Sequence, residues 1–217
     1  MLDNHGFNLW AGDYDEAVEA SDDDNTYPFA GYKDLMNVIY GTVMSQNPTT
    51  VLDIGIGTGT LTFKLYESGI KITGIDFSDE MLAIVREKMP TATLIKHDFT
   101  KGMPAEVRGA KYDFIISTYA LHHLTDDEKV SFLLSATEHL NNNGKIIIGD
   151  VSFQNKADLD NCKISSGDEW DDDEFYFIFT ELEEKLKDKY HLTYRQISHC
   201  AGILEVSSLH HTEGCSS

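Results

Sequence analysis

Three glycines at alternate positions form the most informative chemical pattern in this chain of 217 residues. Gly55, Gly57 and Gly59 directly follow the apolar run 51–54, which carries the acid Asp53. Glycine permits positive φ and close approach of the backbone to a ligand, and the first N–H groups of a following helix are unpaired and partly positive. The pattern therefore predicts a buried strand that turns sharply into a helix and binds a nucleotide-like ligand. An ordinary strand-to-helix turn without a ligand is the alternative interpretation.

The spacing of the glycines separates two classes of nucleotide site. Counted from Gly55, the dinucleotide fingerprint G-x-G-x-x-G/A places its third small residue at position 60, which is Thr60. The observed spacing is D-x-G-x-G-x-G, which resembles motif I of the class I S-adenosyl-L-methionine (AdoMet)-dependent methyltransferases. The resemblance implies that Asp53 and the three glycines belong to an AdoMet site.

A second acid lies at the distance from this turn that a nucleotide site requires. Asp76 follows the expected strand 71–75. Nucleotide-binding folds place a ribose-binding carboxylate about 20 residues after the glycine turn, and a carboxylate accepts hydroxyl hydrogens strongly. Asp76 is therefore a candidate ligand of the ribose diol. The alternative is a plain acid at the start of the helix expected over 79–89.

The resemblance implies further contacts with the cofactor. In this family an acid after the third strand bonds the adenine amine, and a neighbouring side chain packs on the ring. Asp98 and Phe99, after the expected strand 93–96, match these two positions. The other positions carried over from the family are Phe77, Thr118 and, in the entry segment 10–15 that reaches over the cofactor, Tyr14.

Composition excludes several classes of partner. The chain has 37 acidic against 17 basic residues, a net charge of −20, and no Lys/Arg cluster. Such a surface repels polyanions, so we expect no nucleic-acid partner. The three cysteines are scattered, without a C-x-x-C pair, which favours a reducing cytoplasm over a disulfide framework. The start lacks the pattern of a signal peptide, and no apolar run approaches the ~18 residues of a membrane span, so we expect no membrane partner.

Apolar strands alternate with helical patterns along most of the chain. This alternation predicts an α/β fold with a doubly wound, mostly parallel, Rossmann-like sheet that helices cover on both faces. A capping box over 125–128 opens a helix expected to reach Leu140, and 141–144 is expected to stop it. The expected strands are 50–54, 71–75, 93–96, 112–117 and 145–149. Between the first three of these strands, helices are expected over 59–67 and 79–89.

The two ends of the chain depart from this alternation. Strands expected over 190–199 and 202–209 have too short a join for a parallel crossover, so they must be antiparallel. This gives a seven-stranded sheet with a C-terminal antiparallel hairpin strand, in one methyltransferase domain over 1–217. Its expected parts are a helical lid (1–45), a cofactor-binding core (46–150), an acidic helical insertion (151–189) and the terminal hairpin (190–209).

A finer resemblance lies after the fourth strand. Leu121-His122-His123-Leu124 is similar to the turn found in ubiquinone/menaquinone-biosynthesis-type methyltransferases, a small-molecule branch, and the likeness covers roughly 7–209. Two segments depart from that branch. Residues 140–144 stand in place of its Leu-x-Pro-Gly-Gly loop, and the acidic stretch 154–174 leaves the acceptor pocket undefined.

The turn after the fourth strand is expected to face the transferring methyl group, because ligands bind beyond the carboxyl ends of parallel strands. Imidazole exchanges protons near neutral pH, so His123, favoured over His122, is a candidate general base or acceptor-orienting group. Helix capping or space filling is the alternative. We expect no metal, because adjacent side chains usually diverge and rarely share an ion. The turn also lacks the Asn/Asp-Pro-Pro-aromatic sequence of enzymes that methylate bases or glutamine amides.

These patterns together predict transfer of a methyl group from AdoMet to a small-molecule acceptor, with S-adenosyl-L-homocysteine (SAH) as product. The sulfonium already activates the methyl group, so alignment of the acceptor is the main task of the protein. Three alternatives stay open: a catalytically silent AdoMet-binding module or regulator, a nicotinamide-dependent oxidoreductase with a variant turn, and an aminopropyl transferase. The patterns specify neither the acceptor nor the oligomeric state.

Overall fold

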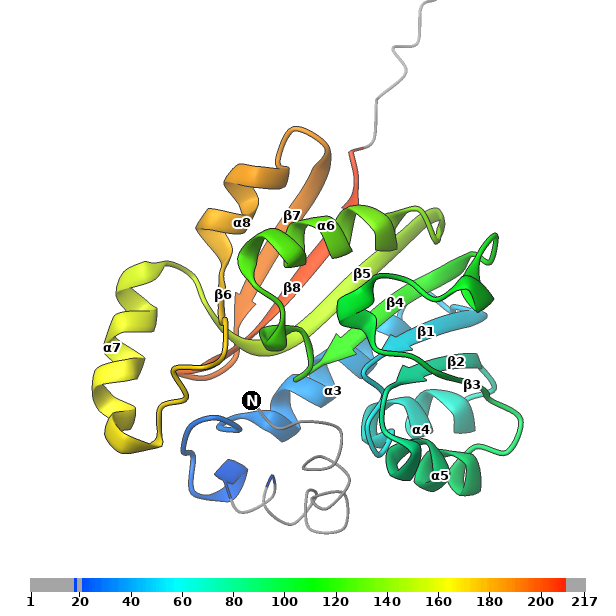
Figure 1. Cartoon of the computed structure of the whole chain (residues 1–217), viewed down its shortest axis with the longest axis horizontal. Coiled ribbons are helices and arrows are strands. Elements are labelled where there is room, and N and C mark those ends of the chain that lie inside the picture. The colour runs from blue at the N-terminus through cyan, green and yellow to red at the C-terminus, as the bar shows by residue number, and fades with distance from the viewer. Residues whose placement is uncertain (1–17, 19–20, 210–217) are drawn as a thin grey trace, which may run out of the picture.

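A computed structural model describes residue 18 and residues 21–209 of the chain. Its described part contains an eight-stranded sheet in the order β3-β2-β1-β4-β5-β8-β7, with β6 paired to β5 (Figure 1). The strands are β1 (Thr50–Ile54), β2 (Lys71–Asp76), β3 (Thr93–Lys96), β4 (Tyr112–Thr118), β5 (Leu140–Phe153), β6 (Phe177–Ile178), β7 (Tyr190–Gln196) and β8 (Ala201–Ser208). The α-helices are α3 (Tyr32–Met44), α4 (Thr60–Glu67), α5 (Asp79–Lys88), α6 (Asp126–Thr137), α7 (Lys156–Ser166) and α8 (Phe179–Leu186).

Strand direction confirms the predicted fold class. β1 pairs in parallel with β2 and β4, and β4 pairs in parallel with β5. β8 pairs antiparallel with both β5 and β7, so the parallel core ends in the predicted hairpin. The carboxyl ends of β1, β2 and β4 therefore meet at one edge of the sheet, where ligands of such folds bind.

Residues that alternate along the strands bury two hydrophobic cores. Val51 faces the core that contains Leu35 of α3 and Leu65 of α4. Its neighbour Leu52 faces the opposite core, with Phe132 of α6. Helices α3, α4 and α5 accordingly cover one face of the sheet, and α6 and α8 cover the other (Figure 1). This two-sided cover explains why the central strands are continuously apolar.

Local capping groups fix where two helices begin. Ser78 caps α5, because its hydroxyl accepts a hydrogen bond from Met81 N at 3.2 Å. The predicted capping box at Thr125 and Glu128 is present and opens α6. The helix that it opens ends at Thr137.

The boundary between α6 and β5 was predicted wrongly. The helix was expected to reach Leu140 and the strand to start at Lys145, but β5 begins at Leu140 and includes the run 141–144. The pairing with β4 jumps from Tyr112↔Leu140 to Phe114↔Lys145, which makes this run a bulge. Asparagine and glycine commonly stop helices, but they also tolerate the backbone conformations that a bulge requires. Asn143, within the bulge, has a φ of +66°.

Two smaller corrections concern the second half of the chain. Ala201 and Gly202 lie inside β8 and do not form the join, which spans 197–200. A Cβ on Gly202 would lie 2.3 Å from the Tyr194 hydroxyl, so a glycine is needed within this strand. The short strand β6, within the expected acidic insertion, was missed because two residues show no periodicity.

Among the described residues, no helix has both the length and the apolar character needed to cross a membrane.

The expected lid over 1–45 falls partly on residues outside those described. Its described portion contains α3, which packs on the sheet: a Cβ on Gly149 of β5 would lie 2.5 Å from the Leu35 side chain. The proposed division into lid, core, insertion and hairpin stays a prediction.

Candidate functional site

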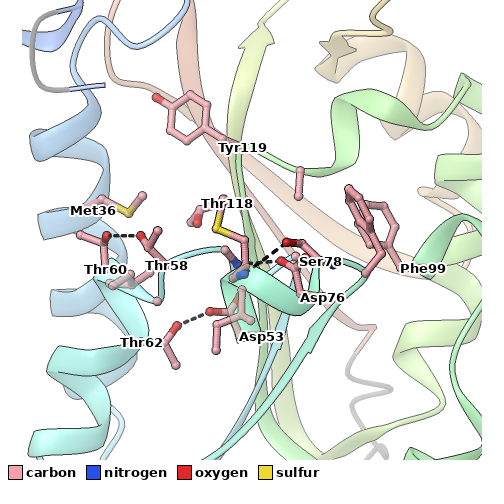
Figure 2. A pocket seen from close by; sticks show the side chains of 18 of the residues that line it. Met36, Asp53, Thr58, Thr60, Thr62, Asp76, Ser78, Phe99, Thr118 and Tyr119 are labelled. Carbon is pink, nitrogen blue, oxygen red and sulfur yellow. Dashed lines mark hydrogen bonds between the residues drawn. The ribbon is translucent and has the colours of Figure 1, made fainter. Parts of the chain in front are cut away.

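A cavity of about 760 Å³ opens at the carboxyl ends of β1, β2 and β4 (Figure 2). The wall includes most of the residues that the sequence predicted for the cofactor: Asp53, Gly55, Gly57, Gly59, Asp76, Phe77, Phe99 and Thr118.

The glycine turn has the backbone that its spacing predicts. Gly55, Gly57 and Gly59 all have positive φ, at +70°, +53° and +73°. A Cβ on Gly55 would lie 2.5 Å from Cβ of Ala120, so this position needs glycine for packing as well as for φ. A Cβ on Gly57 would meet nothing within 4 Å, so Gly57 leaves open space at the cavity wall.

Asp76 joins the glycine turn to the next helix. Its Oδ2 accepts a hydrogen bond from Gly57 N, and its Oδ1 accepts one from Ser78 N, both at 2.9 Å. Burial raises the pKa of Asp76, and the backbone N–H groups of Ser78 and Gly57 counteract part of that rise. The backbone N–H of Phe77 also donates to this carboxylate. A carboxylate has about four lone-pair positions, so a further hydrogen bond can be accepted from a ligand in the cavity.

Asp53 is buried at the base of the cavity. One of its oxygens, Oδ2, accepts a hydrogen bond from the Thr62 hydroxyl (Figure 2). Among the described residues, the other oxygen, Oδ1, has no hydrogen-bond partner. Burial raises the pKa of Asp53 to about 7, opposed by the Thr62 bond and reinforced by the charge of Asp76. A buried acceptor without a partner points to a ligand that brings a donor or a positive charge.

Aromatic side chains form another part of the cavity wall. Tyr119, at the end of β4, has a φ of +49°, which is uncommon for a bulky residue and marks local strain. Its ring lies 5.4 Å from the ring of Tyr32 and 5.1 Å from that of Phe29, measured between centroids. Tyr119 and Tyr32 both line the cavity, and Phe99 lines it from the end of β3.

Sequence reasoning missed several wall residues, most of them hydroxyl-bearing or apolar side chains next to the predicted motifs. A hydroxyl two or three residues from a glycine turn is a weak signal, because threonine and serine are common in loops. The wall residues missed are Tyr32, Met36, Ile56, Thr58, Thr60, Leu61, Thr62, Ser78 and Met81.

One predicted cofactor residue, Asp98, is described by the structure but does not line the cavity. Asp98 caps the short turn Phe99–Lys101, accepting bonds from Thr100 N at 3.1 Å and from the Thr100 hydroxyl at 2.6 Å, and it pairs with Lys101. Its role at the adenine stays a prediction. Tyr14 lies outside the described residues.

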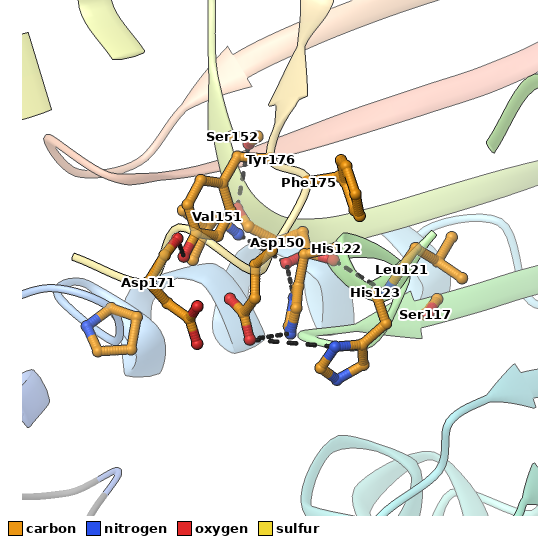
Figure 3. A network of polar contacts seen from close by, with 12 residues as sticks. Ser117, Leu121, His122, His123, Asp150, Val151, Ser152, Asp171, Phe175 and Tyr176 are labelled. Atoms are coloured by element: carbon orange, nitrogen blue, oxygen red, sulfur yellow. Dashed lines mark hydrogen bonds and ion pairs between the residues drawn. The ribbon is translucent and has the colours of Figure 1, made fainter. Parts of the chain in front are cut away.

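The two candidate catalytic histidines have different surroundings. His123 lines the cavity, whereas His122 is buried behind it, with Nδ1 2.7 Å from Oδ1 of Asp150 (Figure 3). Burial opposes protonation of His122, but the charge and hydrogen bond of Asp150, helped by Glu174, raise its pKa. Burial and the neighbouring charge of His122 lower the pKa of His123 to about 4.

Similarity to known proteins agrees with this geometry. Residues 51–144 match the protein family described as "Methyltransferase domain". An uncharacterized methyltransferase of Geobacillus sp. (strain WCH70) is 37% identical over 150 residues, which cover 69% of this chain and 68% of the relative. Another uncharacterized methyltransferase, from Bacillus cytotoxicus, is 31% identical over 215 residues, which cover 93% of this chain and 95% of the relative.

A solved structure shows the same fold. The magnesium protoporphyrin IX methyltransferase of Synechocystis PCC 6803, with bound SAH, has a TM-score of 0.67 at 18% identity, over 83% of this chain and 85% of that one. The chain therefore belongs to the methyltransferases, with the class I fold whose enzymes take the methyl group from AdoMet. The quinone-type branch within that class stays a prediction.

Proposed function

We propose that this enzyme methylates a small molecule that binds at the aromatic end of the cavity, beside Tyr119 and His123. The supporting observation is that these two side chains share one cavity with the glycine turn and Asp76. They follow β4, which pairs directly with β1. An acceptor held there lies next to a cofactor held by the turn.

The residues of the cavity fit AdoMet in both shape and charge. AdoMet supplies a methyl group activated by a sulfonium, and it also carries an ammonium group and a ribose diol. Asp76 has a lone-pair position left for the diol beside its three backbone donors, and Oδ1 of Asp53 is a buried acceptor suited to a cationic donor. Gly57 leaves open space where the ligand approaches the backbone, and Phe99 offers a ring face for the base.

Alignment of the acceptor is the main catalytic contribution that we assign to the protein. Holding two reactants in line can lower a barrier by ~7–11 kcal/mol. The Tyr32 and Tyr119 rings form an aromatic wall, which suits dispersal of the sulfonium charge and can hold a cation. A net charge of −20 also favours a small acceptor over a nucleic acid.

The two histidines lie in different places relative to the cavity, so we assign them different roles. We assign His123 to orient the acceptor, because it lines the cavity. His122 is a positioning residue, because its ring is turned to Asp150. His123→Gln should retain AdoMet affinity and slow turnover less than ~10²-fold; a greater loss would instead identify His123 as a general base.

The proposal is tested by incubating the purified protein with methyl-labelled AdoMet and fractionated metabolite pools. We expect stoichiometric formation of SAH and transfer of label to one small-molecule fraction. Binding of AdoMet without SAH formation in any pool would identify a silent module. Thermal stabilisation by NADH but not by AdoMet would instead favour an oxidoreductase.

A further inference from the structure

Three potential metal ligands converge beside the cavity: His122, His123 and Glu174. One ligand atom from each lies within 4.8 Å of the other two. Nε2 of His122 is 3.4 Å from Oε1 of Glu174, and Nδ1 of His123 is 4.0 Å from the same oxygen. The two histidine rings lie side by side, with centroids 4.3 Å apart (Figure 3). The general expectation that adjacent side chains diverge therefore does not hold in this turn.

The backbone fixes this convergence. The short helical turn Leu121–His123 places the two rings together, and Phe175 N donates to the carbonyl of His122 at 2.8 Å. The ammonium of the buried Lys129 donates to the carbonyl of Phe175. Phe175 is thus held at both backbone groups, which positions its neighbour Glu174 against the histidine turn.

Asp150 determines which nitrogen of His122 faces Glu174. The Asp150 carboxylate takes Nδ1–H of His122 and also accepts from Leu121 N at 3.1 Å and Val151 N at 2.8 Å. With its proton on Nδ1, His122 presents the lone pair of Nε2 to the carboxylate of Glu174. Two lone pairs 3.4 Å apart repel unless a proton or a metal ion lies between them. A carboxylate behind the second nitrogen is also the usual support of a metal-binding histidine.

The local charge balance calls for a positive charge between the two carboxylates, which either a proton on His122 or a metal ion can supply. Asp150 is only 1% exposed, and the side chain of Glu174 is 21% exposed. The nearby Lys129 already pairs with Asp126 and with the carbonyl of Phe175. Buried carboxylates need a partner charge or a metal.

We propose that His122, His123 and Glu174 bind a divalent transition-metal ion of the zinc type, with Asp150 holding the His122 ring. Zinc bonds of about 2.0–2.2 Å in tetrahedral geometry place ligand atoms about 3.3–3.5 Å apart. The pair at 3.4 Å has this separation, and the pair at 4.0 Å needs to close by less than 1 Å. Three protein ligands leave a coordination position for water or another ligand. His123 places the ion at the edge of the cavity.

A hydrogen-bonded imidazolium between the two carboxylates would make similar contacts without a metal. Metal titration separates the two arrangements without any assay of methyl transfer. The full chain, without an affinity tag, is stripped with chelator and titrated with Co²⁺, whose visible absorption reports histidine and carboxylate ligation. We expect one equivalent of Co²⁺ to bind and one equivalent of Zn²⁺ to displace it.

Variants assign the site. Glu174→Gln and His123→Gln, both only partly buried, should each weaken Co²⁺ binding at least tenfold, and Asp150→Asn should weaken it ~10–100-fold. Two controls should leave binding unchanged: His191→Gln, an exposed histidine of β7, and the double variant His210→Gln/His211→Gln, which removes the second adjacent pair.

Circular dichroism establishes that each variant is folded. Absence of a Co²⁺ spectrum at one equivalent would overturn the proposal in favour of the imidazolium. Equal Co²⁺ affinity of the folded Glu174→Gln variant and the wild type would also overturn it.

Discussion

Replacing Asp76 by asparagine tests how the glycine turn is coupled to the cofactor. The carboxylate accepts one backbone N–H on each oxygen, from Gly57 and from Ser78, both at 2.9 Å. Asparagine keeps the size of the side chain but offers only one oxygen. Its NH₂ group must then face one of the two N–H donors, and one acceptor of the ribose diol is lost.

The expected loss follows from the charged hydrogen bonds removed. A hydrogen bond to a charged group contributes ~1.5–3 kcal/mol, which corresponds to a roughly 10–150-fold rise in the Kd for AdoMet. Asp76 is buried, so little of this loss is screened by solvent. Calorimetry with AdoMet and SAH measures it directly, and a thermal melt of the free protein separates loss of folding from loss of binding.

A matched control and a modified ligand sharpen this test. Asp79→Asn makes the same change three residues later, on an exposed side chain paired with Lys96, and should leave the Kd unchanged. A 2′-deoxy analogue should bind wild type less tightly than AdoMet, and the Asp76→Asn variant should show a smaller difference between the two ligands. Equal Kd values for wild type and Asp76→Asn, with both folded, would refute the assignment of Asp76 to the ribose.

Three further predictions address the turn, the buried acid and the adenine. Gly55→Ala should lower the free energy of unfolding by ~2–5 kcal/mol, because it adds strain at positive φ and overlaps Ala120. Gly57→Ala should lower it by only ~1–2 kcal/mol but weaken AdoMet binding. Equal losses for the two variants in urea denaturation would contradict this prediction. Because burial raises the pKa of Asp53 from 3.8 to about 7, the stability gained from its retained proton is fully present below pH ~4 and is lost as the pH rises through 7. Stability should thus fall by up to ~4 kcal/mol across this window, and denaturation of Asp53→Asn should show a smaller fall. Asp98→Ala should weaken AdoMet binding and relax discrimination against inosine analogues; unchanged discrimination would leave Asp98 only its role as a cap.

The cofactor half of the site could be predicted because local signals and topology agree there. Val51 to Gly59 holds a buried strand, a sharp turn and a helix start within nine consecutive positions. Parallel pairing then brings the end of β2, with Asp76, beside that turn. No long-range information beyond strand order is needed to place these residues together.

Other features depend on contacts between distant segments, and the sequence carries no signal for them. Asp150 meets His122 across 28 positions because β4 and β5 are neighbours in the sheet. Glu174 reaches the same turn only because Phe175 bonds to His122 and Lys129. The start of β5 was misplaced because asparagine and glycine serve a helix stop and a bulge equally well.

The pairing of β5 with β6 has a consequence for how such an enzyme diversifies. Ser152 lies opposite Phe177, so the segment 154–176, which carries α7 and Glu174, begins and ends at adjacent points of the sheet. Doubling the length of such a closed loop costs only about 0.6 kcal/mol. Evolution can therefore exchange or lengthen this one segment while the glycine turn and Asp76 stay unchanged. Grafting this segment between relatives accordingly tests whether it contributes to acceptor preference.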